Sequence, residues 1–172
     1  MPKNRCVFLD RDGVLNKDRP NYVYDPGHFE IIEGVPETLK ALKQRGYLLI
    51  VVTNQAGIAR GLYTREDMHR CHEYLQQQCG GAIDHFYYAP SHPSVSESLS
   101  RKPDSLLFEK AISRYNIDPG KSWMVGDRER DLIPAKKLGM ATIIVGENQS
   151  DYADYKGNGL WEVLDIIIGY GQ

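Results

Sequence analysis

The sequence predicts an α/β protein with one parallel, Rossmann-like sheet flanked by helices. Short apolar runs of strand length alternate with segments of helical periodicity along the 172 residues, and this alternation favours a parallel sheet with right-handed crossovers. The apolar runs are nearly continuous, as in strands that are covered on both faces. Polar clusters follow several runs where the strand ends, so we expect them to meet at one edge of the sheet, where open α/β sheets bind ligands.

The first predicted strand begins at Cys6 and ends in two carboxylates, Asp10 and Asp12, two positions apart. Gly13 follows and gives the backbone freedom to bend, so that both carboxylates can face one pocket. A carboxylate pair of this kind attracts a divalent cation. One aspartate held against Mg²⁺ can attack phosphorus while the second gives and later takes a proton. Taken alone, the same residues also fit a strand end with solvated acidic groups.

Residues 17–32 are rich in Pro, Asn, Asp, Gly and Tyr, which predicts an irregular loop or a short hairpin over the end of this strand. Loops in that position usually shape the substrate site. The next helix is predicted over 34–46, with a proline in its first turn and a glycine at its end. A second strand over 47–53 then ends in polar groups, and Thr53 is expected at the same edge as Asp10.

A capping box formed by Thr64 and Asp67 starts a predicted helix that runs to about Cys79. His69 and His72 lie three positions apart on this helix. Because no third ligand is near them in the sequence, we interpret both as exposed surface residues rather than as a metal site.

The second half of the chain continues the alternation with a strand over 82–88, a loop over 89–101, a helix over 104–115, a strand from 122 to Gly126, a helix over 133–138, a strand over 140–146 and a helix over 158–168. Arg101 and Lys102 precede the first of these helices, either as a surface basic pair or as cations lying over the carboxylates. Asp127 directly follows a strand, and Asp131 lies near the start of the next helix. Carboxylates therefore stand at a strand end for a second time.

The length and composition of the chain argue against several classes of protein. The length suits a single domain over 1–172, and the formal net charge of −2 provides no basic surface for nucleic acid. No apolar run approaches the roughly 20 residues of a membrane span, so we expect a cytoplasmic protein without a membrane partner. The three cysteines are odd in number and lack C-x-x-C spacing, which argues against a disulfide framework or a zinc knuckle. A monomer is the expected assembly.

Four clusters, namely Asp10-x-Asp12, Thr53, Lys102 and Gly126-Asp127-x-x-x-Asp131, occur in this order at strand ends or on loops beside them. Together they resemble the haloacid dehalogenase-like superfamily of phosphohydrolases. The stretches Phe8 to Gly13, Thr53 to Gly61 and Arg101 to Pro103 resemble the group that contains heptose bisphosphate and histidinol-phosphate phosphatases. The resemblance covers nearly the whole chain and implies a Mg²⁺-dependent phosphatase acting on a small phosphorylated sugar, with histidinol phosphate or another small phosphate ester as the alternative substrate.

The resemblance implies a role for each matching residue. Asp10 would be the nucleophile that forms an aspartyl-phosphate, and Asp12 the general acid and base, with its backbone carbonyl on Mg²⁺. Thr53 and Lys102 would hold the transferring phosphoryl group, and Asp127 would complete the metal shell. The residues expected to contact substrate, Arg101 foremost, are Arg11, Asp18, Arg19, Asn21, Tyr22, Asn54, Gln55, Arg60, Arg101 and Arg128.

Two residues, Asp131 and Arg128, each have two possible roles. Asp131 either orients a metal ligand or a metal-bound water, or only favours the N-terminus of its helix through the dipole. Arg128 either touches phosphate or covers the surface. The physical reason to expect cations here is general, because a carboxylate and a phosphate dianion repel each other unless positive charge lies between them.

One departure from the family pattern and one missing insertion concern neighbouring segments. Members of the heptose phosphatase group usually carry a structural zinc loop, and the matching positions here are Ala89, Ser91, Ser98 and Ser100, none of them a good zinc ligand. We therefore expect no zinc, and a loop held by packing or hydrogen bonds. No large insertion follows Asp12 or separates Thr53 from Lys102, so we expect no separate cap domain.

The alternative outside the enzymes is a receiver-like module, which also uses a phospho-accepting aspartate, a threonine, a lysine and Mg²⁺ on an α/β sheet. In receivers the acceptor ends an internal strand and an acidic pair precedes it. Here the candidate acceptor Asp10 ends the first strand, and Asp12 follows it. Since Asp12 supplies the acid and base that turnover needs, the order favours the enzyme.

Overall fold

The computed structural model describes residues 1–170, and its centre is one six-stranded parallel sheet in the order β3-β2-β1-β4-β5-β6. The strands are β1 (Cys6–Leu9), β2 (Leu48–Asn54), β3 (His85–Ala89), β4 (Trp123–Gly126), β5 (Ala141–Val145) and β6 (Tyr155–Gly157). All neighbouring pairs run parallel. The chain leaves β1 toward β2 and later returns to its other side as β4, so the strand order reverses at β1. A crevice for ligands opens at such a point.

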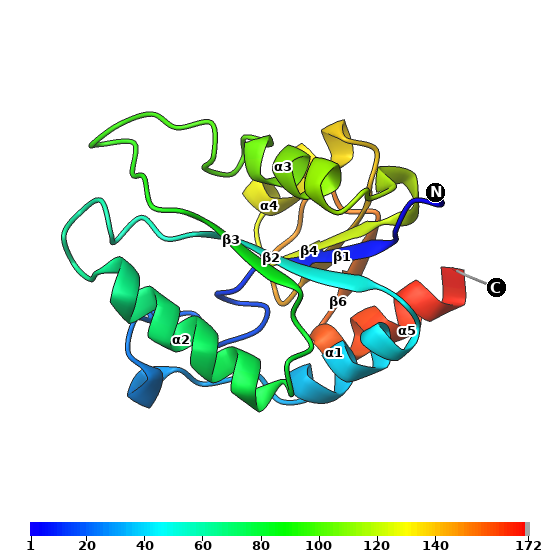
Figure 1. Ribbon diagram of the computed structural model, residues 1–172, viewed down its shortest axis with the longest axis horizontal. Coiled ribbons are helices and arrows are strands. Elements are labelled where there is room, and N and C mark those ends of the chain that lie inside the picture. The colour runs from blue at the N-terminus through cyan, green and yellow to red at the C-terminus, as the bar shows by residue number, and fades with distance from the viewer. Residues whose placement is uncertain (171–172) are drawn as a thin grey trace.

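Helices cover both faces of the sheet, with α1, α2 and α5 on one side and α3 and α4 on the other (Figure 1). Their bounds are α1 (Val35–Gln44), α2 (Arg65–Gln78), α3 (Leu106–Arg114), α4 (Glu129–Lys137) and α5 (Leu160–Tyr170), with short 3₁₀ turns at Pro26–His28 and Pro119–Lys121. Strand β1 shows why two cores form, because successive side chains point to opposite faces. Val7 and Leu9 enter the core under α1, α2 and α5, whereas Cys6 and Phe8 enter the core under α3 and α4.

The predicted architecture is confirmed, and the described residues contain no separate cap domain. The capping box of Thr64 and Asp67 starts α2 as expected. The structure adds one element, since β6 was not predicted from its three residues. Helix α4 also begins four residues earlier than predicted, at Glu129, because Asp131 caps it. Within the described residues, no helix combines the length and the apolar character that crossing a membrane requires.

The interpretation of His72 as an exposed residue was wrong. Its side chain is only 4% exposed and its ring stacks on Phe86 at 4.5 Å between centroids. Nε2 of His72 lies 3.4 Å from the Arg11 guanidinium. Burial lowers the pKa of His72 to about 2, and the charges of Arg11 and His69 add to this. His72 is therefore neutral in the folded protein, while His69 is exposed as predicted.

Acidification is expected to destabilise the fold through His72. The unfolded chain takes up a proton near pH 6.5 whereas the folded chain does not, so stability falls as the pH drops below that value. Between pH 7.5 and 5.5 this single group lowers the free energy of unfolding by about 1.4 kcal/mol. The measurement is urea unfolding at both pH values. From pH 7.5 to 5.5, the free energy of unfolding should fall by about 1.4 kcal/mol less in His72→Phe than in wild type. Equal losses in the two proteins would rule out His72 as the source.

Candidate active site

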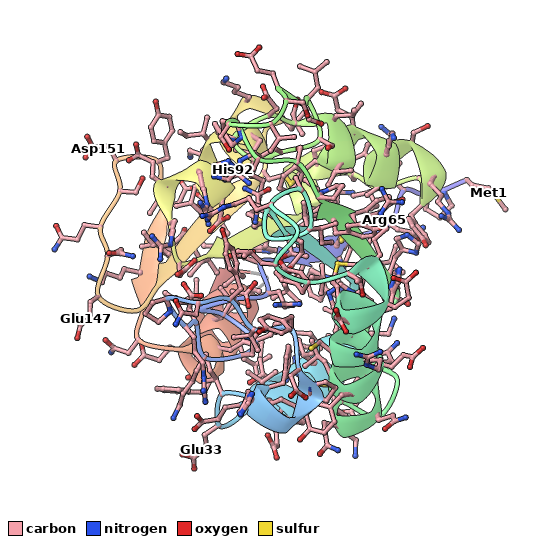
Figure 2. The ribbon with its side chains drawn as sticks, turned by 90° about the vertical axis from the view of Figure 1, so that its left-hand side faces the viewer. Met1, Glu33, Arg65, His92, Glu147 and Asp151 are labelled. Carbon is pink, nitrogen blue, oxygen red and sulfur yellow. The ribbon has the colours of Figure 1, made fainter. Side chains whose placement is uncertain are left out.

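The candidate site lies at the carboxyl ends of the three central strands. Leu9 of β1 pairs with Val51 of β2 and with Val125 of β4. Because the strands are parallel and in this register, Asp10 and Asp127, which directly follow β1 and β4, emerge side by side, and Thr53 lies next to them in β2. Figure 2 looks onto this edge, with Arg65 on one side, Asp151 on the other and His92 between them.

Three carboxylates form a buried acidic cluster. Asp10, Asp127 and Asp131 each offer an oxygen within 4.8 Å of the others. Asp10 is 5% exposed and Asp131 is fully buried. Two glycines make this packing possible: a Cβ on Gly13 would lie 2.3 Å from Asp127 Oδ2, and one on Gly126 would lie 2.4 Å from the Asp131 Cβ. Larger residues at either position would push the carboxylates apart.

Lys102 is the buried cation of the site. Its Nζ donates to Asp10 Oδ1 at 2.9 Å and to the Val52 carbonyl at 2.7 Å, and it forms an ion pair with Asp131 Oδ1 at 2.7 Å. Burial opposes a charged amine, but the carboxylates of Asp10 and Asp131 outweigh it and raise the pKa of Lys102. The lysine is therefore charged, and it fixes the orientation of Asp10.

The acidic cluster carries more negative charge than Lys102 balances. Burial raises the pKa of Asp10 well above its usual range, with Asp131 adding to the effect and Lys102 opposing it. Burial and the neighbouring Asp131 raise the pKa of Asp127 to about 6. Asp127 Oδ1 is buried without a hydrogen-bond partner. Carboxylate oxygens in this arrangement are the ligands that Mg²⁺ prefers, so the residues present fit a divalent cation.

The Asp12 carboxylate is held by donors on both of its oxygens. Oδ1 accepts from Arg11 Nη2 at 2.8 Å and from Asn16 Nδ2 at 3.0 Å, and Oδ2 accepts from Gln55 Nε2 at 3.2 Å. The Asp12 side chain is still 22% exposed. A carboxylate that is oriented in this way and open to solvent is suited to exchanging a proton with a bound molecule.

Three residues expected at the substrate are hydrogen-bonded to other protein groups in this structure. Arg11 is 1% exposed, and its guanidinium also donates to the Val23 carbonyl at 2.8 Å and lies over the Phe29 ring. Gln55 is 2% exposed. The side chains of Arg11 and Gln55 are thus buried among other protein groups. Asn54 is half-buried, and its side-chain amide makes two hydrogen bonds with the backbone of Lys102. Oδ1 accepts from the Lys102 N–H at 3.0 Å, and Nδ2 donates to the Lys102 carbonyl at 3.2 Å.

The remaining expected residues form the rim of the opening. Arg60 Nη1 donates to the Tyr22 hydroxyl at 3.1 Å, and Arg128 pairs with Asp18 at 3.2 Å. Half-buried Arg101 donates to the Ser91 carbonyl at 3.2 Å. Asp18, Arg19 and Asn21 are exposed. The loop over 17–32 and the segments after β2 and β4 thus bring arginines to this end of the sheet.

Asp131 lies at the N-terminus of its helix, as one of its two alternatives expected, and it also contacts Lys102. Oδ2 accepts from the backbone N–H of Arg128 at 3.1 Å and so caps α4, while Oδ1 pairs with Lys102. Two residues without a predicted role also belong to the site, Asn16 and Tyr63. Asn16 closes the motif that starts at Asp10, so its position was a signal. Tyr63, which donates to Gln55, had no signal in the sequence.

Comparison with known proteins shows the family of the chain. The family model described as "Haloacid dehalogenase-like hydrolase" matches residues 16–145. The chain belongs to this family. A heptose-1,7-bisphosphate 7-phosphatase named for the β-anomer, from Haemophilus ducreyi, is 41% identical over 150 residues, which cover 82% of each chain. The corresponding α-anomer enzyme of Burkholderia mallei is 39% identical over 83% of this chain and 80% of its own.

One solved structure is similar to this chain over nearly its whole length. The crystal structure of D,D-heptose 1,7-bisphosphate phosphatase from B. bronchiseptica, complexed with magnesium and phosphate, superimposes with a TM-score of 0.88 at 26% identity. The match covers 96% of this chain and 99% of that one. The family and these relatives make the chain a phosphoric monoester hydrolase by descent.

The loop between β3 and α3 is held by hydrogen bonds of its own residues. Ser98 Oγ and Ser100 Oγ lie 2.8 Å apart, and Arg101 reaches the Ser91 carbonyl. Ala89 is fully buried at the end of β3. These four positions offer neither a thiolate nor an imidazole, so the donor set does not fit zinc. The expectation that hydrogen bonds or packing hold this loop is confirmed.

Proposed function

We propose that this chain is a Mg²⁺-dependent phosphatase that removes the 7-phosphate of D-glycero-D-manno-heptose 1,7-bisphosphate and leaves heptose 1-phosphate. The observation that carries the proposal is the position of Asp10, which Lys102 orients within the acidic cluster, with the partly exposed Asp12 two residues away. The names of the relatives support the sugar substrate, and the magnesium in the neighbouring crystal structure supports the metal.

In the proposed reaction an oxygen of Asp10 attacks phosphorus, and the bond from phosphorus to the sugar oxygen breaks. Asp12 gives its proton to that leaving oxygen, which departs as an alcohol. Water then attacks the aspartyl-phosphate and gives a proton to Asp12, which releases inorganic phosphate and restores Asp10. Thr53 and Lys102 are assigned to the equatorial oxygens, where negative charge is held in the transition state.

Asp10, Asp127 and the backbone carbonyl of Asp12 would hold the metal. When bound, Mg²⁺ supplies positive charge that lets two anions, a carboxylate and a phosphate, approach each other. Arg11, Asn16 and Gln55 keep Asp12 oriented toward the leaving group. Asp131 keeps Lys102 charged and in place.

The arginines of the rim suit a substrate with a second phosphate. Arg60, Arg101 and Arg128 stand on three different segments around the carboxylates. Arg128 Nε also lies 3.7 Å from Asp127 Oδ2, which brings one guanidinium to the edge of the acidic cluster. A guanidinium binds phosphate with two parallel hydrogen bonds, which gives orientation as well as affinity. We assign these three arginines, together with Arg19, Asn21 and Tyr22, to substrate selection.

The test is phosphate release with Mg²⁺ from both anomers of heptose 1,7-bisphosphate, histidinol phosphate and common sugar monophosphates. We expect kcat/KM for one heptose anomer to exceed that of every other substrate class by about 10²-fold, because a site that pairs a second phosphate rejects molecules without it. Chelation of Mg²⁺ should abolish release. A preference for histidinol phosphate or a monophosphate would contradict the proposed substrate. Activity without any divalent cation would contradict the proposed requirement for Mg²⁺.

Gly13→Ala is expected to weaken Mg²⁺ binding by about 10–100-fold, because the new Cβ collides with the Asp127 carboxylate at a backbone φ of +89°. Isothermal titration of the protein with Mg²⁺ measures this directly. Gly139→Ala is the matched control, since Gly139 has a φ of +84° with nothing within 4 Å of the added atom. Equal Mg²⁺ affinities in the two variants would show that Asp127 does not bind the ion.

A further inference from the structure

We propose that Tyr63 is a positioning residue that sets the orientation of the Gln55 amide and, through it, the carboxylate of Asp12. This inference rests on the proposed phosphatase function and adds to it a residue outside the motifs of the sequence. It concerns the chain of hydrogen bonds from Tyr63 through Gln55 to Asp12 and Thr53.

Tyr63 lies on the loop between β2 and α2, with a side chain that is 5% exposed. Its hydroxyl donates to Gln55 Oε1 at 2.6 Å. The ring packs between two tyrosines of the 17–32 loop, tilted against Tyr22 at 5.8 Å and stacked on Tyr24 at 5.1 Å between centroids. Gly57 leaves the space for this ring, because a Cβ there would lie 2.1 Å from it. The hydroxyl is therefore fixed in direction by packing.

Gln55 reaches both candidate catalytic groups with one nitrogen. Its Nε2 donates to Asp12 Oδ2 at 3.2 Å and to Thr53 Oγ1 at 2.9 Å. In the structure this end of the amide is the nitrogen, which suits a carboxylate and a hydroxyl oxygen that accept hydrogen bonds. The oxygen then points toward Tyr63 and needs a donor, since the side chain is buried.

The Tyr63 hydroxyl is the donor of the hydrogen bond that Gln55 Oε1 accepts. Burial raises the pKa of Tyr63, so the hydroxyl stays protonated and able to donate. Without it, Gln55 Oε1 loses its only side-chain donor within the described residues. The buried oxygen then has no partner, and the amide loses the contact that fixes its direction, so its Nε2 holds the Asp12 carboxylate less firmly. Tyr63 thus restrains the amide that positions Asp12.

The consequence for the reaction depends on the leaving group. In the first step Asp12 gives its proton to the oxygen that leaves phosphorus, and a sugar alkoxide needs that proton. A nitrophenolate leaves without one, because the ring stabilises the negative charge. A less firmly held Asp12 therefore slows formation of the aspartyl-phosphate from a sugar phosphate and spares its formation from 4-nitrophenyl phosphate. The parameter kcat/KM reports this first step, since it ends at the first irreversible bond cleavage.

The experiment compares wild type with Tyr63→Phe, which removes only the hydroxyl and keeps the ring. Tyr47→Phe is the control, because Tyr47 is also buried, at 7% exposure, and lies at the opposite end of β2 from the site. We expect Tyr63→Phe to lower kcat/KM for heptose 1,7-bisphosphate about tenfold and for 4-nitrophenyl phosphate less than about twofold. Tyr47→Phe should change neither.

A second readout needs no substrate. In a nitrogen-15 NMR spectrum, the side-chain amide protons of Gln55 should exchange with water at least about tenfold faster in Tyr63→Phe than in wild type or Tyr47→Phe. Unchanged exchange, or equal losses of kcat/KM for the two substrates, would overturn the role of Tyr63. If wild type hydrolyses neither substrate, the proposed function fails, and the amide exchange still decides whether Tyr63 orients Gln55.

Discussion

Asp10→Asn is expected to reduce phosphate release by roughly 10⁴-fold or more, the largest effect of any single change in this chain. An amide is a poor nucleophile toward phosphorus, and Asp10 is the carboxylate that Lys102 orients at the end of β1. The measurement is release of inorganic phosphate at saturating Mg²⁺, together with a search by mass spectrometry for phosphate on residue 10 of wild type.

Asp151→Asn is the matched control, since Asp151 is an exposed aspartate that lies at the left margin of the view in Figure 2. It should retain full activity. Thermal unfolding of Asp10→Asn should confirm that the variant is folded, so that lost chemistry is not mistaken for lost structure. If Asp10→Asn retains more than about a tenth of the wild-type rate, Asp10 is not the nucleophile.

Lys102→Met is expected to lower the free energy of unfolding by about 3–5 kcal/mol and to reduce activity strongly as well. The lysine is 2% exposed and joins two buried carboxylates, Asp10 and Asp131, to the Val52 carbonyl. Methionine has similar bulk but no charge, so it leaves both carboxylates buried without their cation. Urea unfolding at neutral pH without added Mg²⁺ measures the effect.

Lys136→Met gives the comparison for a surface ion pair. Lys136 pairs with Asp154 at a partly exposed position, where such a pair contributes about 0–1 kcal/mol. The two variants remove the same charge and differ in the burial of the site. If Lys102→Met costs no more than Lys136→Met, Lys102 does not neutralise the acidic cluster.

The strand ends were the part of the site that sequence could predict. Asp10, Thr53 and Asp127 directly follow or end apolar runs, and a parallel sheet brings such positions together whatever the details of packing. Lys102 lies on a loop, and its place was predicted from resemblance rather than from periodicity. The structure brings it to Asp10 because Asn54 binds its backbone on both sides.

Burial of polar side chains was the part that sequence could not predict. Arg11 and Gln55 stand in polar motifs at strand ends, yet both side chains are buried by contacts with neighbouring loops. His72 lies on the same face of α2 as Met68 and Leu75, and Phe86 of β3 covers its ring. Strand β6 was missed because it is three residues long and pairs only with β5. Each of these depends on contacts between separate segments of the chain, which local periodicity does not report.

The measurement that tests the central claim most directly is phosphorus-31 NMR of heptose 1,7-bisphosphate during incubation with the protein and Mg²⁺. We expect the signal of the ester at carbon 7 to disappear while inorganic phosphate appears in equal amount and the anomeric phosphate persists. Loss of the anomeric phosphate first, or no change in either signal over many hours at high protein concentration, would contradict the proposed function.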